Sequence, residues 1–147
     1  MRRLYADEIR IEKLREISFF GVQGHRVAQS EVDLIRACNT FNTNIIYCKR
    51  GQMDAMVDSI LGDRQLVSVD LSSIKSNFAP GVGLPSPAMG FTQDQICDIA
   101  SKVGQNATNR VFSLSEYNPA IEKYRTGALL QFIFSSFIFG VAKASAE

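Results

Sequence analysis

Four short apolar segments recur along the chain, each enriched in β-branched or aromatic residues. They are Ile17–Val22, Asn44–Cys48, Gln65–Leu71 and Arg110–Glu116. None alternates cleanly between polar and apolar positions, which is the pattern of parallel strands covered on both faces. The pattern therefore predicts four strands of a parallel sheet.

Segments with helical spacing of apolar residues lie between and after these strands. Helices are expected over Glu31–Phe41, over Gln52–Leu61, from Thr92 to about Val103, and from near Pro119–Ala120 almost to the C-terminus. Thr92 is a suitable N-cap, and Gln95 three residues later completes a capping-box pattern. Strands that alternate with helices predict right-handed crossovers and a single α/β domain over residues 1–147.

The stretch Gly127–Ala142 could be mistaken for a membrane span because it is uncharged over sixteen residues. A bilayer crossing needs about 20 apolar residues, and this stretch also contains Gln131 and Ser135. We therefore expect a helix that is buried on most sides, and no membrane partner.

Composition narrows the classes of function. With 147 residues and 46% hydrophobic content, the chain is long enough for one compact domain. Its 16 basic and 15 acidic residues are spread along the chain, so the sequence predicts no concentrated positive patch that would attract nucleic acid. Three cysteines at unrelated spacings and a single histidine, His25, exclude a Cys/His zinc site within one chain. Reduced thiols and a charged first segment without an apolar core predict a cytoplasmic location.

One loop interrupts the alternation of strands and helices. Between Ser72 and Phe91 the chain holds three prolines and three glycines, and no regular element is expected there. The loop leaves the carboxyl end of the third strand, where open α/β sheets bind their ligands. Long loops of this kind are commonly functional.

Two carboxylates stand at the ends of predicted strands. Asp70 ends the third strand and Glu116 ends the fourth. If these strands are neighbours, both carboxylates face one crevice above the sheet. The alternative is that each carboxylate caps a loop or pairs with a nearby arginine.

Several strings along the chain match, in order, the signature elements of one enzyme family. They are Ser68-Val69-Asp70-Leu71-Ser72-Ser73-Ile74-Lys75-Ser76, Ala79-Pro80-Gly81-Val82-Gly83, Ser115-Glu116-Tyr117-Asn118-Pro119 and Tyr124-Arg125-Thr126-Gly127, with further similarity at Arg2-Arg3 and Val22-Gln23-Gly24-His25-Arg26. The set resembles the S-x-D-x-D-x-x-D-P…A-P-G, E-x-N-P and R-T-A/G elements of the ureohydrolases, which include arginase, agmatinase and formimidoylglutamase.

The resemblance implies a three-layer αβα fold with a parallel sheet flanked by helices, of which this chain would form about half, the C-terminal half. It also implies a hydrolase of linear amidines or guanidines that uses two manganese ions to generate a hydroxide. The A-P-G-V-G and E-Y-N-P strings favour the formimidoylglutamase branch. That branch hydrolyses N-formimidoylglutamate in histidine degradation.

Compared with the family pattern, the chain lacks most metal ligands. Asp70 matches the aspartate that bridges both metals, but Ser72 replaces the second aspartate and Lys75 the next one. The family's G-G-D-H and D-x-H-x-D segments are absent, so five of six ligands are missing. We predict that the chain alone does not retain manganese and is inactive. Glu116 matches the residue that contacts the cationic amidine or guanidine end of the substrate.

Four hypotheses of function remain open. The chain is a truncated part of a formimidoylglutamase-like enzyme, or the corresponding part of an agmatinase- or arginase-like enzyme. Alternatively, it is a non-catalytic structural or regulatory partner of an active paralogue, within a homo- or hetero-oligomer, or a generic α/β ligand-binding domain. Because half a sheet exposes a strand edge and apolar faces, the isolated chain is expected to be poorly soluble or oligomeric.

Overall fold

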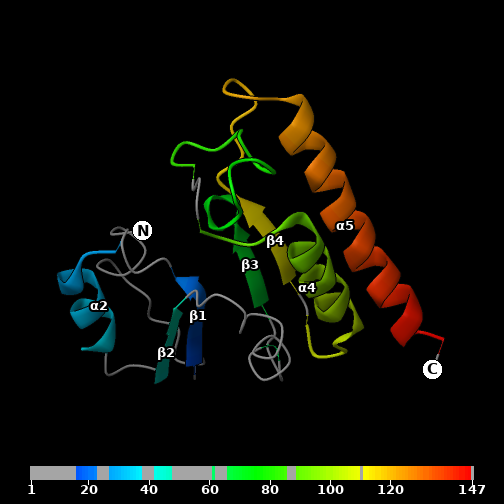
Figure 1. The fold of residues 1–147 in the computed structure, drawn as a ribbon. Helices are drawn as coiled ribbons and strands as arrows, with labels where there is room; N and C mark the ends of the chain where they lie inside the picture. The colour runs from blue at the N-terminus through cyan, green and yellow to red at the C-terminus, as the bar shows by residue number, and fades with distance from the viewer. Residues whose placement is uncertain are drawn as a thin grey trace. The chain divides into compact units, whose positions relative to one another are not determined.

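A computed structural model describes residues 16–22, 27–37, 42–47, 61, 66–85, 89–109 and 111–146 (Figure 1). The chain divides into two compact units, Met1–Cys48 and Lys49–Glu147. Each unit contains one pair of parallel strands. All four predicted strands are present, and their ends differ from the prediction by no more than two residues.

In the first unit, β1 (Glu16–Val22) pairs with β2 (Asn42–Tyr47), and α2 (Gln29–Arg36) lies in the connection between them. The helix begins two residues before the predicted start. Its first turn is stabilised by Glu31, whose carboxylate accepts a hydrogen bond from the Ala28 N–H at 3.3 Å. Positions 38–41 of the predicted helix lie outside the described residues.

In the second unit, β3 (Leu66–Asp70) pairs with β4 (Val111–Ser115), and Asp70 lies opposite Ser115. α4 (Gln93–Gln105) occupies the crossover between them, and α5 (Tyr124–Ala144) follows β4. Apart from Leu61, the predicted helix over Gln52–Leu61 falls outside the described residues. This unit therefore has the strand–helix–strand–helix order expected of a parallel α/β fold.

The predicted capping box of α4 is confirmed. The Thr92 hydroxyl accepts a hydrogen bond from the Gln95 N–H at 3.3 Å, and the Gln95 side chain accepts one from the Thr92 N–H at 3.0 Å. The helix turns an apolar face inward, formed by Ile96, Ile99, Ala100 and Val103. Asp94 and Asp98 lie on its exposed face.

The start of α5 was predicted wrongly. The helix begins at Tyr124 and not near Pro119–Ala120. The Asn118 side chain accepts a hydrogen bond from the Ala120 N–H at 3.0 Å, and the Asn118 carbonyl accepts one from the Ile121 N–H at 3.1 Å. An asparagine that satisfies backbone donors in this way favours a turn, so the helix starts later.

Two glycines set the distance between α4 and α5, which lie side by side in Figure 1. A Cβ atom at Gly104 would clash with the Phe137 carbonyl on α5, and one at Gly140 would clash with the Ser101 carbonyl on α4. The two helix backbones therefore touch at this crossing, and any side chain at either position would separate them.

The prediction that the last helix is buried on most sides was also wrong. α5 buries Thr126, Leu129, Ile133 and Gly140, whereas Phe139 on the other side is 73% exposed. Its inner face meets α4 and the Phe112 ring of β4, and its first turn contacts Gly81. By length and composition alone α5 could cross a membrane, a test that buried helices of folded domains also pass.

The Pro/Gly-rich loop after β3 is more ordered than predicted. It opens with a short 3-10 helix, Leu71–Ser73, and Ile74 forms a parallel bridge with Phe91. Val82 forms an antiparallel bridge with Tyr117. Several apolar side chains from Leu71 to Phe91 belong to the core, whereas Leu84 and Met89 are exposed; the buried ones are Leu71, Ile74, Ala79, Val82 and Phe91.

Candidate functional site

Asp70 lies at the carboxyl end of β3 and caps the turn that follows. Its Oδ1 accepts a hydrogen bond from the Ser72 N–H at 2.7 Å, and its carbonyl accepts one from the Ser73 hydroxyl at 2.6 Å. The carboxylate is half-buried, and only Oδ1 has a hydrogen bond within the described part of the chain. Asp70 thus has the local capping role that its position allowed.

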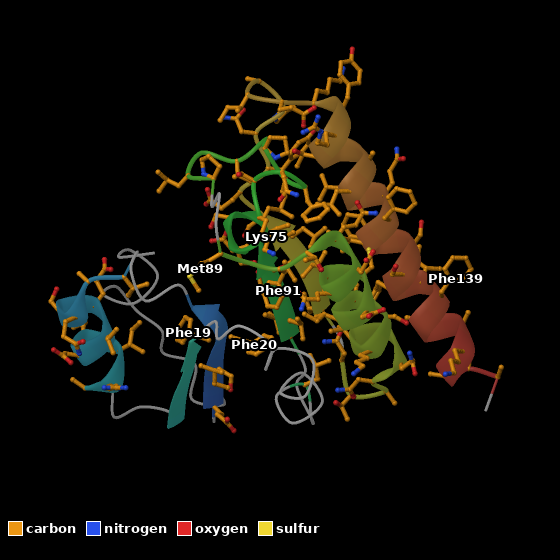
Figure 2. The ribbon with its side chains drawn as sticks, viewed as in Figure 1. Phe19, Phe20, Lys75, Met89, Phe91 and Phe139 are labelled. Atoms are coloured by element: carbon orange, nitrogen blue, oxygen red, sulfur yellow. The ribbon has the colours of Figure 1, made fainter. Side chains whose placement is uncertain are left out.

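The two positions that would complete a metal site carry unsuitable groups. Ser72 offers a neutral hydroxyl, and Lys75 brings an ammonium group next to the same turn. The Lys75 N–H donates a hydrogen bond to the Phe91 carbonyl at 3.0 Å, which ties this residue to the start of the next helix (Figure 2). Across residues 66–85, 89–109 and 111–146, no three His, Cys, Asp or Glu side chains gather to hold a metal. These residues do not fit a dinuclear manganese centre by themselves.

Glu116 follows β4 directly and has a rare backbone conformation. Its φ is +70°, the only positive φ at a non-glycine among the residues described. A non-glycine residue in this region costs of order 1–3 kcal/mol and persists where the surroundings enforce it. The Glu116 side chain is exposed. Strained backbone conformations cluster at active sites and ligand-binding positions, so Glu116 is a candidate for such a role.

The strand adjacency on which a shared site depends is present. β3 and β4 are hydrogen-bonded neighbours, and Asp70 is level with Ser115, the residue before Glu116. Both carboxylates therefore lie at the carboxyl end of one parallel strand pair, which is where α/β folds bind ligands.

A chain of hydrogen bonds connects the three motif segments that follow β3 and β4. The Asn118 N–H donates to the Gly81 carbonyl at 2.8 Å, and the Gly81 N–H donates to the Thr126 hydroxyl at 2.8 Å. A Cβ atom at Gly81 would clash with the Glu122 carbonyl, so only glycine fits there. The A-P-G loop, the E-Y-N-P turn and the start of α5 thus form one unit that fixes the backbone around Glu116.

Glu122 completes this network, and sequence analysis did not single it out. Its carboxylate accepts hydrogen bonds from the Thr126 N–H at 2.8 Å, the Arg125 N–H at 2.7 Å and the Thr126 hydroxyl at 2.9 Å. The Thr126 and Arg125 N–H groups, aided by that hydroxyl, lower the pKa of Glu122 from 4.5 to about 2, although desolvation acts in the opposite direction. A carboxylate ahead of the helix start was the available signal, but placing that start at Pro119 concealed it.

The remaining candidate groups offer little reactivity. Burial raises the pKa of the Cys97 thiol, although a hydrogen bond with Ser136 acts in the other direction, so little of it is thiolate at neutral pH. His25, the segment around it and Arg2-Arg3 lie outside the described residues, as do Cys38 and Cys48.

Comparisons with known proteins agree with the pattern of motifs. The model of the arginase family matches residues 1–139. No curated protein sequence matches the chain. Among solved structures, Trypanosoma cruzi formiminoglutamase with Mn²⁺ is 26% identical with a TM-score of 0.74, and the match covers 85% of this chain and 43% of that one.

Two further structures show the same fold. Bacillus subtilis formimidoylglutamase has a TM-score of 0.72 at 17% identity, covering 84% of this chain and 41% of that one. Entamoeba histolytica arginase in complex with L-ornithine has a TM-score of 0.68 at 23% identity, covering 82% of this chain and 42% of that one. The chain spans less than half the length of these structures.

Proposed function

Because this chain belongs to the arginase family, we propose that it is the amidine-binding half of a formimidoylglutamase-like hydrolase and is inactive by itself. The observation that carries the proposal is the position of Glu116. Its exposed carboxylate follows β4, next to the strand that ends in Asp70, and its backbone is held in a strained conformation. The whole domain over residues 1–147 is proposed to be one part of the ureohydrolase fold.

The chemistry of the proposed ligand follows from the carboxylate. An amidinium or guanidinium group is planar and cationic, and it presents parallel N–H donors that match the two oxygens of a carboxylate. Glu116 would accept these N–H groups. The network from Gly81 through Thr126 to Glu122 would hold the backbone on either side of it in place. Such prior ordering reduces the entropy lost on binding.

The proposed substrate is N-formimidoylglutamate, whose formimino carbon–nitrogen bond the complete enzyme would hydrolyse in the cytoplasm. Two observations support this choice over agmatine or arginine. The T. cruzi formiminoglutamase is 26% identical to the matched part of this chain, and the A-P-G-V-G and E-Y-N-P strings favour the same branch.

Metal chemistry is not assigned to this chain. The T. cruzi formiminoglutamase structure contains Mn²⁺, but the corresponding region here has one carboxylate, a serine and a lysine. One aspartate does not hold two divalent ions against hydration. Turnover would therefore require ligands from residues that this chain does not contain.

Binding and turnover can be measured separately. Isothermal titration with N-formimidoyl-L-glutamate should detect weak binding to the wild-type chain, and Glu116→Gln should weaken it by about tenfold because a charge-assisted hydrogen bond is lost. Ammonia release with added Mn²⁺ should stay at background. Arginine and agmatine, titrated in the same way, rank the three substrates.

Asp98→Asn is the matched control, because it removes one exposed carboxylate from the outer face of α4. Its affinity should equal that of the wild type. If Glu116→Gln binds as tightly as Asp98→Asn, Glu116 has no role in binding and the proposal fails. Steady turnover by the chain alone would also contradict it.

A second candidate function is a non-catalytic partner of an active ureohydrolase. Ser72 and Lys75 favour it, because both replace family aspartates within the part of the fold that the chain retains. Purification from the native source would separate the two functions. Co-purification with an intact, manganese-containing paralogue supports the partner role, whereas family-like turnover by a longer parent that carries Ser72 supports the enzyme.

A further inference from the structure

One polar side chain is buried in the core of the second unit. Thr126 is fully buried, and it is the only buried polar or charged side chain among the residues that the structure describes. Its hydroxyl accepts a hydrogen bond from the Gly81 N–H at 2.8 Å and donates one to the Glu122 carboxylate at 2.9 Å. Burying a hydroxyl is costly unless it keeps such partners, so these two contacts account for its place in the core.

The Glu122 carboxylate fixes the direction of these two hydrogen bonds. An ionised carboxylate can only accept, so the Thr126 hydroxyl must donate to it and turns its lone pairs toward Gly81. Glu122 is oriented in turn by the Arg125 and Thr126 N–H groups, from which it accepts at 2.7 and 2.8 Å. Thr126 therefore presents an acceptor of fixed position to the loop that contains Gly81.

Glu116 is the single residue between two pairings of the backbone. Before it, β4 ends at Ser115 in the register of the parallel pair. After it, Tyr117 forms the antiparallel bridge with Val82, the residue that follows Gly81. The change of direction between the two pairings therefore falls on Glu116, which accounts for its φ of +70°. A strained conformation of this kind persists only while the surroundings hold it on both sides.

We propose that Thr126 is a positioning residue for the Glu116 carboxylate and acts through the backbone of Gly81. The inference rests on the proposed binding of an amidinium group by Glu116. With the hydroxyl present, the segment Gly81–Val82 is held against the residues that follow Glu116, and the carboxylate leaves the backbone in one direction. Without it, the Gly81 N–H is buried without its acceptor and the segment moves. Glu116 then relaxes to a negative φ, which turns its carboxylate away from the ligand.

Thr126→Val separates this role from the capping of α5. Valine has nearly the shape of threonine and keeps the backbone N–H that Glu122 caps, so only the hydroxyl is lost. Isothermal titration of the full chain with N-formimidoyl-L-glutamate should show an affinity about fivefold lower. The loss is partial because the Tyr117 hydroxyl, which donates to the Lys123 carbonyl at 3.0 Å, still anchors the turn. Thr126→Ser retains the hydroxyl and should bind within about twofold of the wild type.

Two comparisons distinguish positioning from a loss of stability. Ile133→Val removes one buried methylene from the same helix and should destabilise the chain without changing its affinity. Adding Thr126→Val to Glu116→Gln should weaken binding by less than about twofold, because a residue that acts through Glu116 loses its effect with that charge. Losses that multiply in the double variant would overturn the proposal, as would a Thr126→Ser variant that binds as weakly as Thr126→Val. If Thr126→Val loses the helical circular dichroism, Thr126→Cys replaces it; its thiol is a weak acceptor, and an intermediate loss is expected.

A measurement without ligand separates this inference from the proposed function. Backbone chemical shifts of Glu116 should indicate a left-handed conformation in the wild type and in Thr126→Ser, and a negative φ in Thr126→Val. Wild-type shifts at Glu116 in the Thr126→Val chain overturn the inference. If the wild type and Glu116→Gln titrate alike, the proposed function fails and this inference with it. A weaker Glu116→Gln together with an unchanged Thr126→Val refutes the positioning role alone.

Discussion

α4 and α5 pack against each other along one face, yet their opposite faces differ sharply. α4 buries its apolar stripe and exposes Asp94 and Asp98. α5 buries Leu129 and Ile133 but exposes Phe132 and Phe139. Both helices make their close approach through glycine, so the inner faces are equally adapted to each other. The two helices differ only in their outer faces: the outer face of α4 is suited to solvent, whereas that of α5 is suited to contact with further protein.

The difference shows which of the two helices has its apolar surface fully covered within the second unit. The apolar surface of α4 is buried within the second unit, because its buried side chains all face the interior of that unit. α5 has apolar residues on every side, and a helix of this type is stable in water only when it is covered all round. The matched solved structures are more than twice as long as the matched part, which agrees with a surface that requires further protein.

The largest effect should distinguish the two faces of α5. Ile133→Ala removes a fully buried side chain and should lower the free energy of unfolding by about 3–4 kcal/mol, because it leaves a cavity. Ile138→Ala makes the same chemical change at an exposed position and should change it by less than about 0.5 kcal/mol. Urea unfolding at concentrations low enough to keep the chain monomeric measures both, and equal effects would contradict the burial of one face.

A somewhat smaller effect is expected at the crossing of the two helices. Gly140→Ala adds a Cβ atom that clashes with the Ser101 carbonyl, and should cost about 2 kcal/mol as the helices move apart. Gly83→Ala is the control, since a Cβ atom there meets no atom within 4 Å. Thermal unfolding of the two variants checks the comparison. A Gly140→Ala variant as stable as Gly83→Ala would show that the backbones do not touch.

The smallest effect is expected at the start of α5 and depends on pH. The folded chain lowers the pKa of Glu122 from 4.5 to about 2, so the unfolded chain binds this proton more readily. The contribution of Glu122 to stability is therefore complete above about pH 4.5 and is lost as pH falls from there to about 2. Glu122→Gln should reduce the pH dependence of the unfolding midpoint in this window. An unchanged profile would mean that the carboxylate does not cap the helix.

Positions of the elements could be predicted well where one local signal dominated. The four strands and the Thr92–Gln95 capping box followed from β-branched content and from side-chain acceptors next to a helix start. The start of α5 could not be predicted in this way. Asn118 accepts a backbone hydrogen bond in the preceding turn, and the helix begins only after Glu122, whose carboxylate accepts from the N–H groups of its first turn. Asn118 and Glu122 are two possible caps within five residues, and residue propensities alone do not predict which of them precedes the helix.

The candidate site shows the same division. That Asp70 and Glu116 end strands could be predicted from the sequence, as could the replacement of family aspartates by Ser72 and Lys75. The positive φ of Glu116 and the hydrogen bond from Gly81 to Thr126 could not. That hydrogen bond joins residues 45 positions apart, and only the folded chain brings such groups together.

The sequence by itself therefore determined the family, the order of strands and helices, and the loss of metal-ligating side chains. These are properties of residue identity and of local periodicity. Tertiary structure alone decided that β3 and β4 are direct neighbours, that Ile74, Ala79 and Val82 of the Pro/Gly loop are buried in the core, and that α5 keeps one apolar face exposed. Burial depends on which surfaces meet, and a helix that is apolar all round does not encode which of its faces the chain itself will cover.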